Sequence, residues 1–220
     1  ACKNLGKEFI PYIPGTMLYR GYSLASTEPD LLKLIVRLAA AHPTMSIEKG
    51  GPPCIGPDCV HNYLLEKSLW NFFLGEKIRF TGPYGHFTLK KEPHTAVFVA
   101  GGAGLAPILA LLEQWFQEGR QDTAIFFLGE RRFQDIPMAY LPKWLNWQRK
   151  HPNFKCVPVL SGAFRGDNPA ELNDVDKEYF RSVSLEDKQI IKEQGLADEQ
   201  ENQWKGEVGF IGPFLRKHLS

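Results

Sequence analysis

Three uninterrupted apolar runs in the second half of the chain limit its possible folds more than any other feature of the sequence. They cover residues 95–100, 123–128 and 154–160, and helical patterns separate them. Such runs are typical of strands buried on both faces of a parallel sheet. After the first run, apolar residues at positions 108, 109, 111, 112, 115 and 116 predict an amphipathic helix over 105–118 that returns the chain for a parallel neighbour. The second half is therefore predicted to be α/β, doubly wound or close to it.

A glycine-rich segment lies between the first apolar run and this helix. It contains Gly101, Gly102, Ala103, Gly104 and Pro107. Glycines at a strand-to-helix turn let backbone amides approach a pyrophosphate, and the N–H groups at a helix start favour an anion. The segment is not the usual dinucleotide fingerprint G-x-G-x-x-G, and tight packing alone would also explain its glycines. Both interpretations stay open from this segment alone.

The first half of the chain has a different texture. Residues 1–92 are rich in Pro and Gly and break into short pieces that predict short strands, interrupted by one helix for which Asn62 is available as an N-cap. In a strand-like stretch, Arg20 and Tyr22 are two residues apart and therefore point to the same side, where they can address one ligand together. The alternative is a surface arginine beside a half-buried tyrosine.

Composition excludes several classes of protein. With 43% apolar residues and a formal net charge of +1 over 220 residues, the chain is neither a disordered protein nor a general nucleic-acid binder. We expect no transmembrane segment, no signal peptide and a cytoplasmic location. Cys54 and Cys59 lack Cys or His partners at the usual spacing, and His61 alone does not complete a site, so we expect no metal.

Residues 163–205 form an acidic insertion between sheet elements. It is interpreted as a solvated surface excursion with one or two helical turns, or as a docking surface for another protein.

Taken in order, the motifs resemble one family. Arg20-x-Tyr22-Ser23 is followed by the turn at 82–87, the glycine-rich segment at 101–107, the stretch 128–131 and finally Leu160-Ser161. This order and spacing resemble the ferredoxin reductase family of flavoproteins. Residues 19–161 are most similar to the NADH-oxidising FAD subunits of sodium-translocating NADH:quinone oxidoreductases.

The resemblance implies two domains. An antiparallel FAD-binding β barrel would occupy residues 1–92, and a parallel-sheet NAD-binding α/β domain would occupy 93–220, with the active site between them. Family members begin with further strands and finish with a Cys-Gly-Pro loop, so we expect the barrel to be incomplete at its N-terminal side and the α/β domain at its C-terminal side. We also expect slow flavin reduction by these 220 residues alone.

The resemblance also assigns roles to residues. Arg20 would pair with the FAD pyrophosphate, Tyr22 would pack on the isoalloxazine ring, and Ser23, the expected catalytic residue, would lie near the flavin atom that receives hydride. The family's second FAD-phosphate motif falls on 58–61 without its glycine or hydroxyl, which leaves the helix start at His61 and Asn62 to bind the phosphates. The remaining implied cofactor-binding residues are Gly85 for FAD and Gly101, Gly102, Ala103, Gly104, Pro107, Glu130, Arg131 and Ser161 for NAD(H).

The implied function is an FAD-dependent oxidoreductase that passes hydride from NADH to FAD and electrons to an iron–sulfur, quinone or protein acceptor. Its expected partners are NADH and a redox protein or a subunit of a membrane complex, on the cytoplasmic side, with no nucleic acid. The alternative is a reductase-like electron-transfer or assembly subunit that does not oxidise NADH by itself; a third interpretation is an interaction module without cofactors. Because Gly162 follows Ser161, where NADPH-dependent members usually have arginine, we expect NADH to be preferred. His86 is expected to be merely exposed by a turn rather than catalytic.

Overall fold

The structure is a computed structural model that describes residues 22–28, 30–35, 80–92, 94–162, 168–197 and 203–219. Contacts divide the chain into two compact units, Ala1–Tyr22 with Val36–His86 and Ser23–Ile35 with Phe87–Ser220. Of the first unit, the structure describes only Tyr22 and residues 80–86, so the expected FAD-binding barrel lies largely outside the described residues. The second unit holds the sheet and all the helices that the structure describes.

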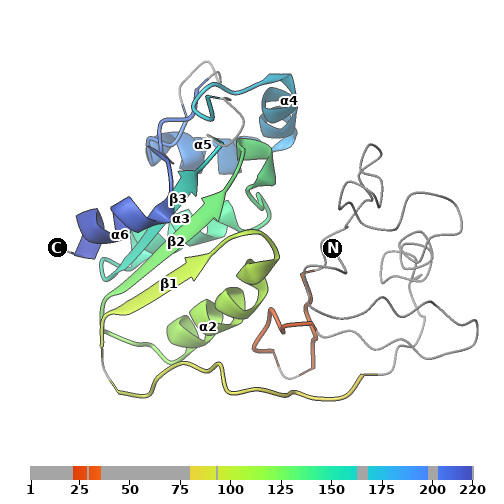
Figure 1. Ribbon diagram of the computed structural model, residues 1–220, viewed down its shortest axis with the longest axis vertical. Helices are drawn as coiled ribbons and strands as arrows, with labels where there is room; N and C mark the ends of the chain where they lie inside the picture. Colours follow the sequence, from red (N-terminus) through yellow and green to blue (C-terminus); the bar gives the residue numbers. More distant parts are fainter. Residues whose placement is uncertain are drawn as a thin grey trace, which may run out of the picture. The chain divides into compact units, whose positions relative to one another are not determined.

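The predicted parallel sheet is present. Its strands are β1 (Ala96–Ala100), β2 (Ala124–Glu130), β3 (Phe154–Leu160) and the short β4 (Glu207–Val208), in the order β1-β2-β3-β4. All pairings are parallel, and Figure 1 shows β1, β2 and β3 side by side. Ala100 lies opposite Leu128, which lies opposite Pro158, so the strands end at one edge.

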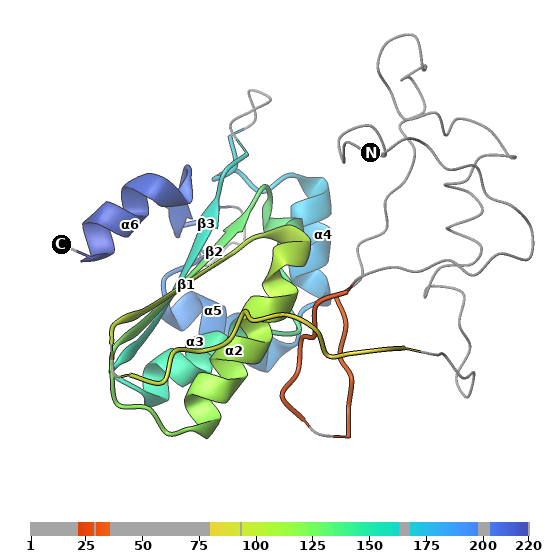
Figure 2. The same cartoon turned by 60° about the horizontal axis from the view of Figure 1, so that its bottom comes forward.

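Helices cover the two faces of the sheet unequally. The amphipathic helix α2 (Leu105–Gln117) ends within a residue of its predicted bound, and α3 (Leu141–Lys150), α4 (Asp174–Ser182) and α5 (Leu185–Glu193) follow it. Two short 3-10 helices, η4 (Gly102–Gly104) and η5 (Phe133–Asp135), precede α2 and α3. Figure 2 shows α2, α3 and α5 on one face of the sheet and α6 (Ile211–Leu219) on the other.

The core lies mainly beneath α2 and α3. Trp115 of α2 and Trp144 of α3 are fully buried there, and the Trp144 ring meets Phe126 of β2 edge-on at 4.9 Å. The opposite face holds a smaller cluster in which Ile211, Phe214 and Leu215 of α6 pack on Ile125, Phe127, Val157 and Val159. Burial of these apolar side chains is the main force that holds the helices on the sheet.

One expectation about the strands is wrong in part. Burial on both faces holds for the centre of β2 and for most of β3, but β1 alternates, with Val97 and Val99 exposed by 39% and 44%. The reason is that the apolar side chains of α6 pack over β2 and β3. The cluster that they form on this face contains no residue of β1. The uninterrupted apolar run thus predicted the strand correctly but overestimated how much of it is buried.

The acidic insertion is more structured than expected. Instead of one or two turns it holds α4 and α5, nine residues each, and Phe180 and Ile191 enter the main core without exposure. Trp204, just before β4, packs in the same core. Charged residues on the outer sides of these helices dominate the composition of the segment. Composition alone therefore did not reveal their apolar faces.

Two further sets of hydrogen bonds hold the chain at the sides of the sheet, one before β1 and one along the edge of β3. The Arg120 guanidinium donates to the carbonyl oxygens of Lys90 (2.6 Å) and Glu92 (3.0 Å) and to the Asp122 carboxylate (2.9 Å). At the β3 edge, the Cys156 N–H donates to the side-chain oxygen of Gln148 on α3 at 2.8 Å.

Candidate functional site

The predicted glycine loop lies at the carboxyl edge of the sheet, directly after β1. Gly101 has an extended backbone, and a Cβ atom added to it would lie 2.7 Å from the carbonyl oxygen of Gly129 on β2. Gly102 has a φ of +52°, a left-handed conformation that other residues rarely adopt. Close approach to β2 at Gly101 and a left-handed turn at Gly102 therefore each require glycine.

The loop presents its backbone to solvent at the start of α2. Residues 101–104 are exposed, none of the described side chains caps α2, and its first turn has no acidic residue. The first N–H groups of a helical run have no partner within it and carry partial positive charge. Because η4 leads directly into α2 and the Gly104 N–H donates to the Gly101 carbonyl at 3.1 Å, these groups are the N–H groups of Gly102 and Ala103. The end of β1 and the start of α2 together therefore form a place suited to an anion such as a pyrophosphate.

Glu130, the last residue of β2, connects three of the predicted site segments. Its carboxylate accepts a hydrogen bond from the Gly102 N–H at 2.9 Å, although 28 residues separate them. Its backbone oxygen accepts the Ser161 N–H at 2.8 Å and is 3.2 Å from the donating Ser161 hydroxyl. The structure thus brings Gly102, Glu130 and Ser161 together at the ends of three neighbouring parallel strands.

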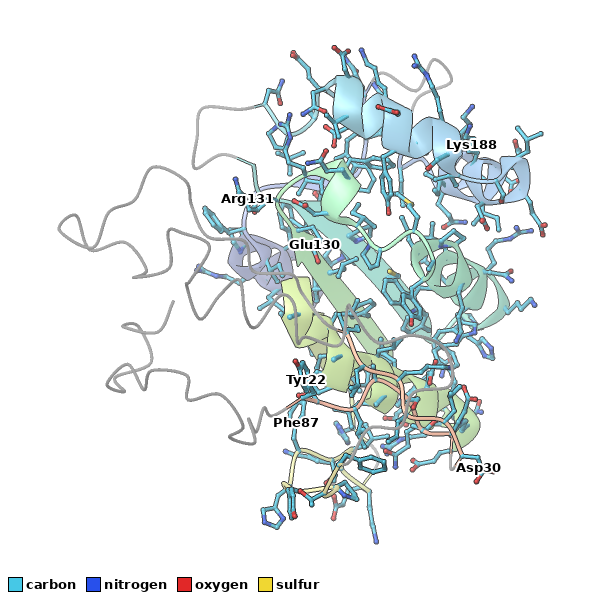
Figure 3. All side chains as sticks on the ribbon, turned by 90° about the vertical axis from the view of Figure 1, so that its right-hand side faces the viewer. Tyr22, Asp30, Phe87, Glu130, Arg131 and Lys188 are labelled. Carbon is cyan, nitrogen blue, oxygen red and sulfur yellow. The ribbon has the colours of Figure 1, made fainter. Side chains whose placement is uncertain are left out.

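Arg131 and Gly162 extend this edge by one residue on each strand. The Gly162 N–H donates to the Arg131 carbonyl at 3.0 Å, while the Arg131 side chain is exposed. Figure 3 shows Glu130 and Arg131 at the same end of the sheet. A Cβ atom on Gly162 would lie 2.7 Å from the Pro169 ring, so this position has no room for a side chain.

The residues expected to bind FAD are only partly described. Tyr22 is 43% exposed, Ser23 is exposed, and Gly85 has a φ of +107° with open space where a Cβ would lie. Arg20, His61 and Asn62 lie outside the described residues. His86 is exposed. The FAD roles of these residues stay predictions.

A buried carboxylate that sequence patterns did not single out supports the segment after Arg131. Asp176 of α4 is almost fully buried, accepts the Gln134 N–H at 3.0 Å and lies 3.7 Å from the Arg132 Nε. It also accepts the Asn173 N–H, while its own N–H donates to the Asn173 side chain. This reciprocal pattern, Asn173 with Asp176 three residues later, is a capping box and was the available sequence signal.

Two further titratable groups line a hollow at another place in the unit. A hollow of about 600 Å³ lies beside β3 and β4, and His218 and Cys156 are among its lining residues. Burial, followed by the charges of Lys155 and Lys217, lowers the pKa of His218, and burial raises the pKa of the Cys156 thiol far above its usual value.

Neither a metal site nor a membrane-crossing helix occurs in the part of the chain that the structure describes. No group of three His, Cys, Asp or Glu side chains could hold an ion within it. None of its helices combines the length and apolar character needed to span a bilayer. Cys54 and Cys59 lie outside the described residues, so the expectation for that pair stays a prediction.

Comparison with known proteins identifies relatives of the chain that contains this sheet edge. The family model described as oxidoreductase NAD-binding domain matches residues 98–191, from β1 into α5. The propane 2-monooxygenase reductase component of Rhodococcus jostii is 34% identical over 164 residues, covering 71% of this chain and 39% of that protein. A subunit of the Na(+)-translocating NADH-quinone reductase of Psychrobacter cryohalolentis is 31% identical over 154 residues, covering 68% and 34%.

The chain therefore spans well under half the length of these two relatives. Among solved structures, an Amycolatopsis cytochrome P450 reductase aligns over 89% of this chain and 58% of its own, with 21% identity and a TM-score of 0.43, too low for a comparison of the two folds.

Proposed function

Because the chain contains the NAD-binding oxidoreductase domain of the ferredoxin reductase family, as its ordered motifs predicted, we propose that it takes hydride from NADH and passes the electrons onward through FAD. The observation that carries this proposal is the carboxyl edge of the sheet. There an exposed glycine loop precedes an uncapped helix, beside Glu130 and Ser161 at the ends of the next two strands.

The loop residues are suited to hold the dinucleotide. The N–H groups of Gly102 and Ala103, at the start of the helical run, would donate to the pyrophosphate, and Pro107 fixes the first turn of α2 without offering an N–H of its own. The exposed Arg131 guanidinium would supply the permanent positive charge. Ser161, held through Glu130, would border the nucleotide at the end of β3.

For the flavin we propose the residues of the family motif. Arg20 would pair with the FAD pyrophosphate, with backbone N–H groups at His61 and Asn62 as a second contact, and Gly85 would allow close approach of the backbone. Tyr22 would pack on the ring and Ser23 would hydrogen-bond near the reacting nitrogen. When bound, the flavin would accept two electrons as hydride and release them singly. The protein's contribution is orientation of the two rings and exclusion of water.

The relatives' names support a redox protein as the electron acceptor. One relative is the reductase component of a monooxygenase, and the other is a subunit of a sodium-translocating NADH-quinone reductase. We therefore propose that this chain donates electrons to a partner protein or to a subunit of a membrane complex.

Two measurements on the purified chain test the proposal. Titration with NADH, followed by fluorescence, should give saturable binding that a Gly102→Val variant loses, because valine is strained at a φ of +52°. The absorption spectrum after addition of FAD should show bound flavin, which NADH bleaches under anaerobic conditions. Absence of NADH binding would overturn the proposal. Bound flavin that NADH does not reduce would favour the alternative, a subunit that retains the fold without oxidising NADH by itself.

A further inference from the structure

Glu130 places a negative charge on the backbone group that the glycine loop would offer to a phosphate. Its carboxylate oxygen is 2.9 Å from the Gly102 nitrogen, at the first residue of η4. We propose that the Glu130 carboxylate competes with the dinucleotide pyrophosphate for the Gly102 N–H and thereby lowers the affinity for NADH. This inference rests on the proposed function, because it assumes that the loop binds a dinucleotide.

The geometry allows the side chain to leave while the strand stays in place. The backbone of Glu130 is fixed by its pairing with β3, where it lies opposite Leu160, and by the Ser161 N–H on its carbonyl. The bond between its carboxylate and Gly102, by contrast, is exposed to solvent. Glu130 itself is half-buried, but a change of its rotamer moves the carboxylate and not the strand, so the Gly102 N–H can change partners without rearrangement of the sheet.

The competition has a chemical basis. A carboxylate oxygen and a phosphate oxygen are both anionic acceptors, and one N–H directed at the first cannot serve the second equally. In the free protein, the carboxylate holds the loop in a conformation in which Gly102 has its partner. In the complex, the displaced carboxylate at the end of β2 stays close to the pyrophosphate at the end of β1 and repels its charge, because β1 and β2 are neighbouring strands.

An isosteric charge removal tests this competition. Glu130→Gln keeps the size of the side chain and leaves the backbone contact with Ser161 intact. The dissociation constant for NADH should fall by about three- to tenfold at 50 mM salt, as expected for loss of repulsion near an exposed site, and the gain should shrink at 500 mM salt. Glu118→Gln is the matched control, because it removes one charge just beyond the opposite end of α2 and should leave the NADH affinity unchanged.

A second measurement follows the Gly102 amide itself. In the ¹H–¹⁵N spectrum, the Gly102 signal of the free protein should differ between Glu130→Gln and wild type, while signals of the core remain and report an intact fold. Inorganic pyrophosphate should then shift this signal at a lower concentration in the variant.

The outcomes separate this inference from the proposed function. If wild type binds NADH and Glu130→Gln binds it equally or more weakly, competition by Glu130 is overturned while the proposed function stands. If neither protein binds NADH up to millimolar concentrations, the proposed function fails and the inference fails with it.

Discussion

At the scale of single residues, the candidate site depends on glycines that perform different tasks. Gly101 allows two strands to approach, Gly102 makes the left-handed turn, and Gly162 makes room for Pro169. Gly104, in the same loop, has an ordinary φ of −66° and open space around it. The structure therefore predicts that similar substitutions in one loop have unequal effects.

Gly101→Ala should destabilise the protein and weaken NADH binding. The new methyl group would lie 2.7 Å from the Gly129 carbonyl oxygen, a backbone atom that cannot move without displacing β2. Overpacking of this kind costs about 1–3 kcal/mol. Urea unfolding and NADH titration of both variants provide the measurement, with Gly104→Ala as a control expected to change stability by less than about 1 kcal/mol. Equal stability of the two variants would contradict the close contact.

Cys156 should not react with thiol reagents in the native protein. Its side chain is buried, and burial raises the pKa of the thiol, so that almost no thiolate exists at pH 8. In a variant with serine at Cys2, Cys54 and Cys59, labelling by Ellman's reagent should be at least about 100-fold slower than in urea, because reaction requires opening of the core. Labelling at the same rate with and without urea would show that this strand edge opens readily.

At the scale of elements, a single arginine joins the segment before β1 to the loop between α2 and β2. Arg120 is 8% exposed in its side chain, contacts the carbonyls of Lys90 and Glu92, and pairs with Asp122. The hydrogen bond from Arg120 is the main reason that the pKa of Asp122 lies below its usual value of 3.8. Burial alone would shift the pKa of this carboxyl in the opposite direction.

Asp122→Asn should therefore destabilise the protein at neutral pH but not in acid. A carboxyl group whose pKa is lower in the folded state stabilises the fold above its unfolded pKa, and this contribution disappears as the pH falls through the lower folded value. We expect a loss of about 1.5 kcal/mol at pH 7, as for a hydrogen bond to a charged group, and convergence of variant and wild type once the pH has fallen below the lowered pKa of Asp122. Urea midpoints at several pH values measure this. Asp30→Asn, at an exposed turn, is the control; a constant difference at all pH values would contradict the assigned cause.

Elements with a local signal were predictable, and those defined by distant contacts were not. The apolar runs predicted β1, β2 and β3, and helical spacing predicted α2, because these patterns depend on neighbours in sequence. The two-residue β4 has no such pattern, and the exposed face of β1 depends on where α6 packs. In the site, the motifs indicated Gly102 and Glu130 separately, but their hydrogen bond across 28 residues required the structure.

At the scale of the whole molecule, the choice between NADH and NADPH depends on which cations surround the nucleotide. The position after Ser161, where the family resemblance implies that an arginine would meet a 2′-phosphate, is Gly162, and the Pro169 ring leaves it no room for a side chain. The exposed Arg131 lies on the neighbouring strand end and, in our proposal, already serves the pyrophosphate.

The protein should accordingly use NADH with a higher kcat/KM than NADPH. A missing charged hydrogen bond of about 1.5 kcal/mol corresponds to a preference of about tenfold. Gly162→Arg should not transfer the preference cleanly, because its Cβ would collide with Pro169 at 2.7 Å and lower stability as well. Steady-state rates with both nucleotides and thermal unfolding of the variant measure these effects. A higher kcat/KM with NADPH in the wild type would show that another cation binds the 2′-phosphate.

The hydrogen bond between Gln148 and Cys156 affects how readily the protein aggregates at high concentration. Among the described residues, β4 pairs only with Val159 and Leu160, which leaves the earlier part of β3 as an open strand edge. An open edge invites a strand from another molecule, and such pairing leads to aggregation. Here the Cys156 N–H is already occupied by Gln148, and Pro158, two residues later on the same side, has no N–H to offer. A helix side chain and a proline thus make this edge a poor template for a second chain.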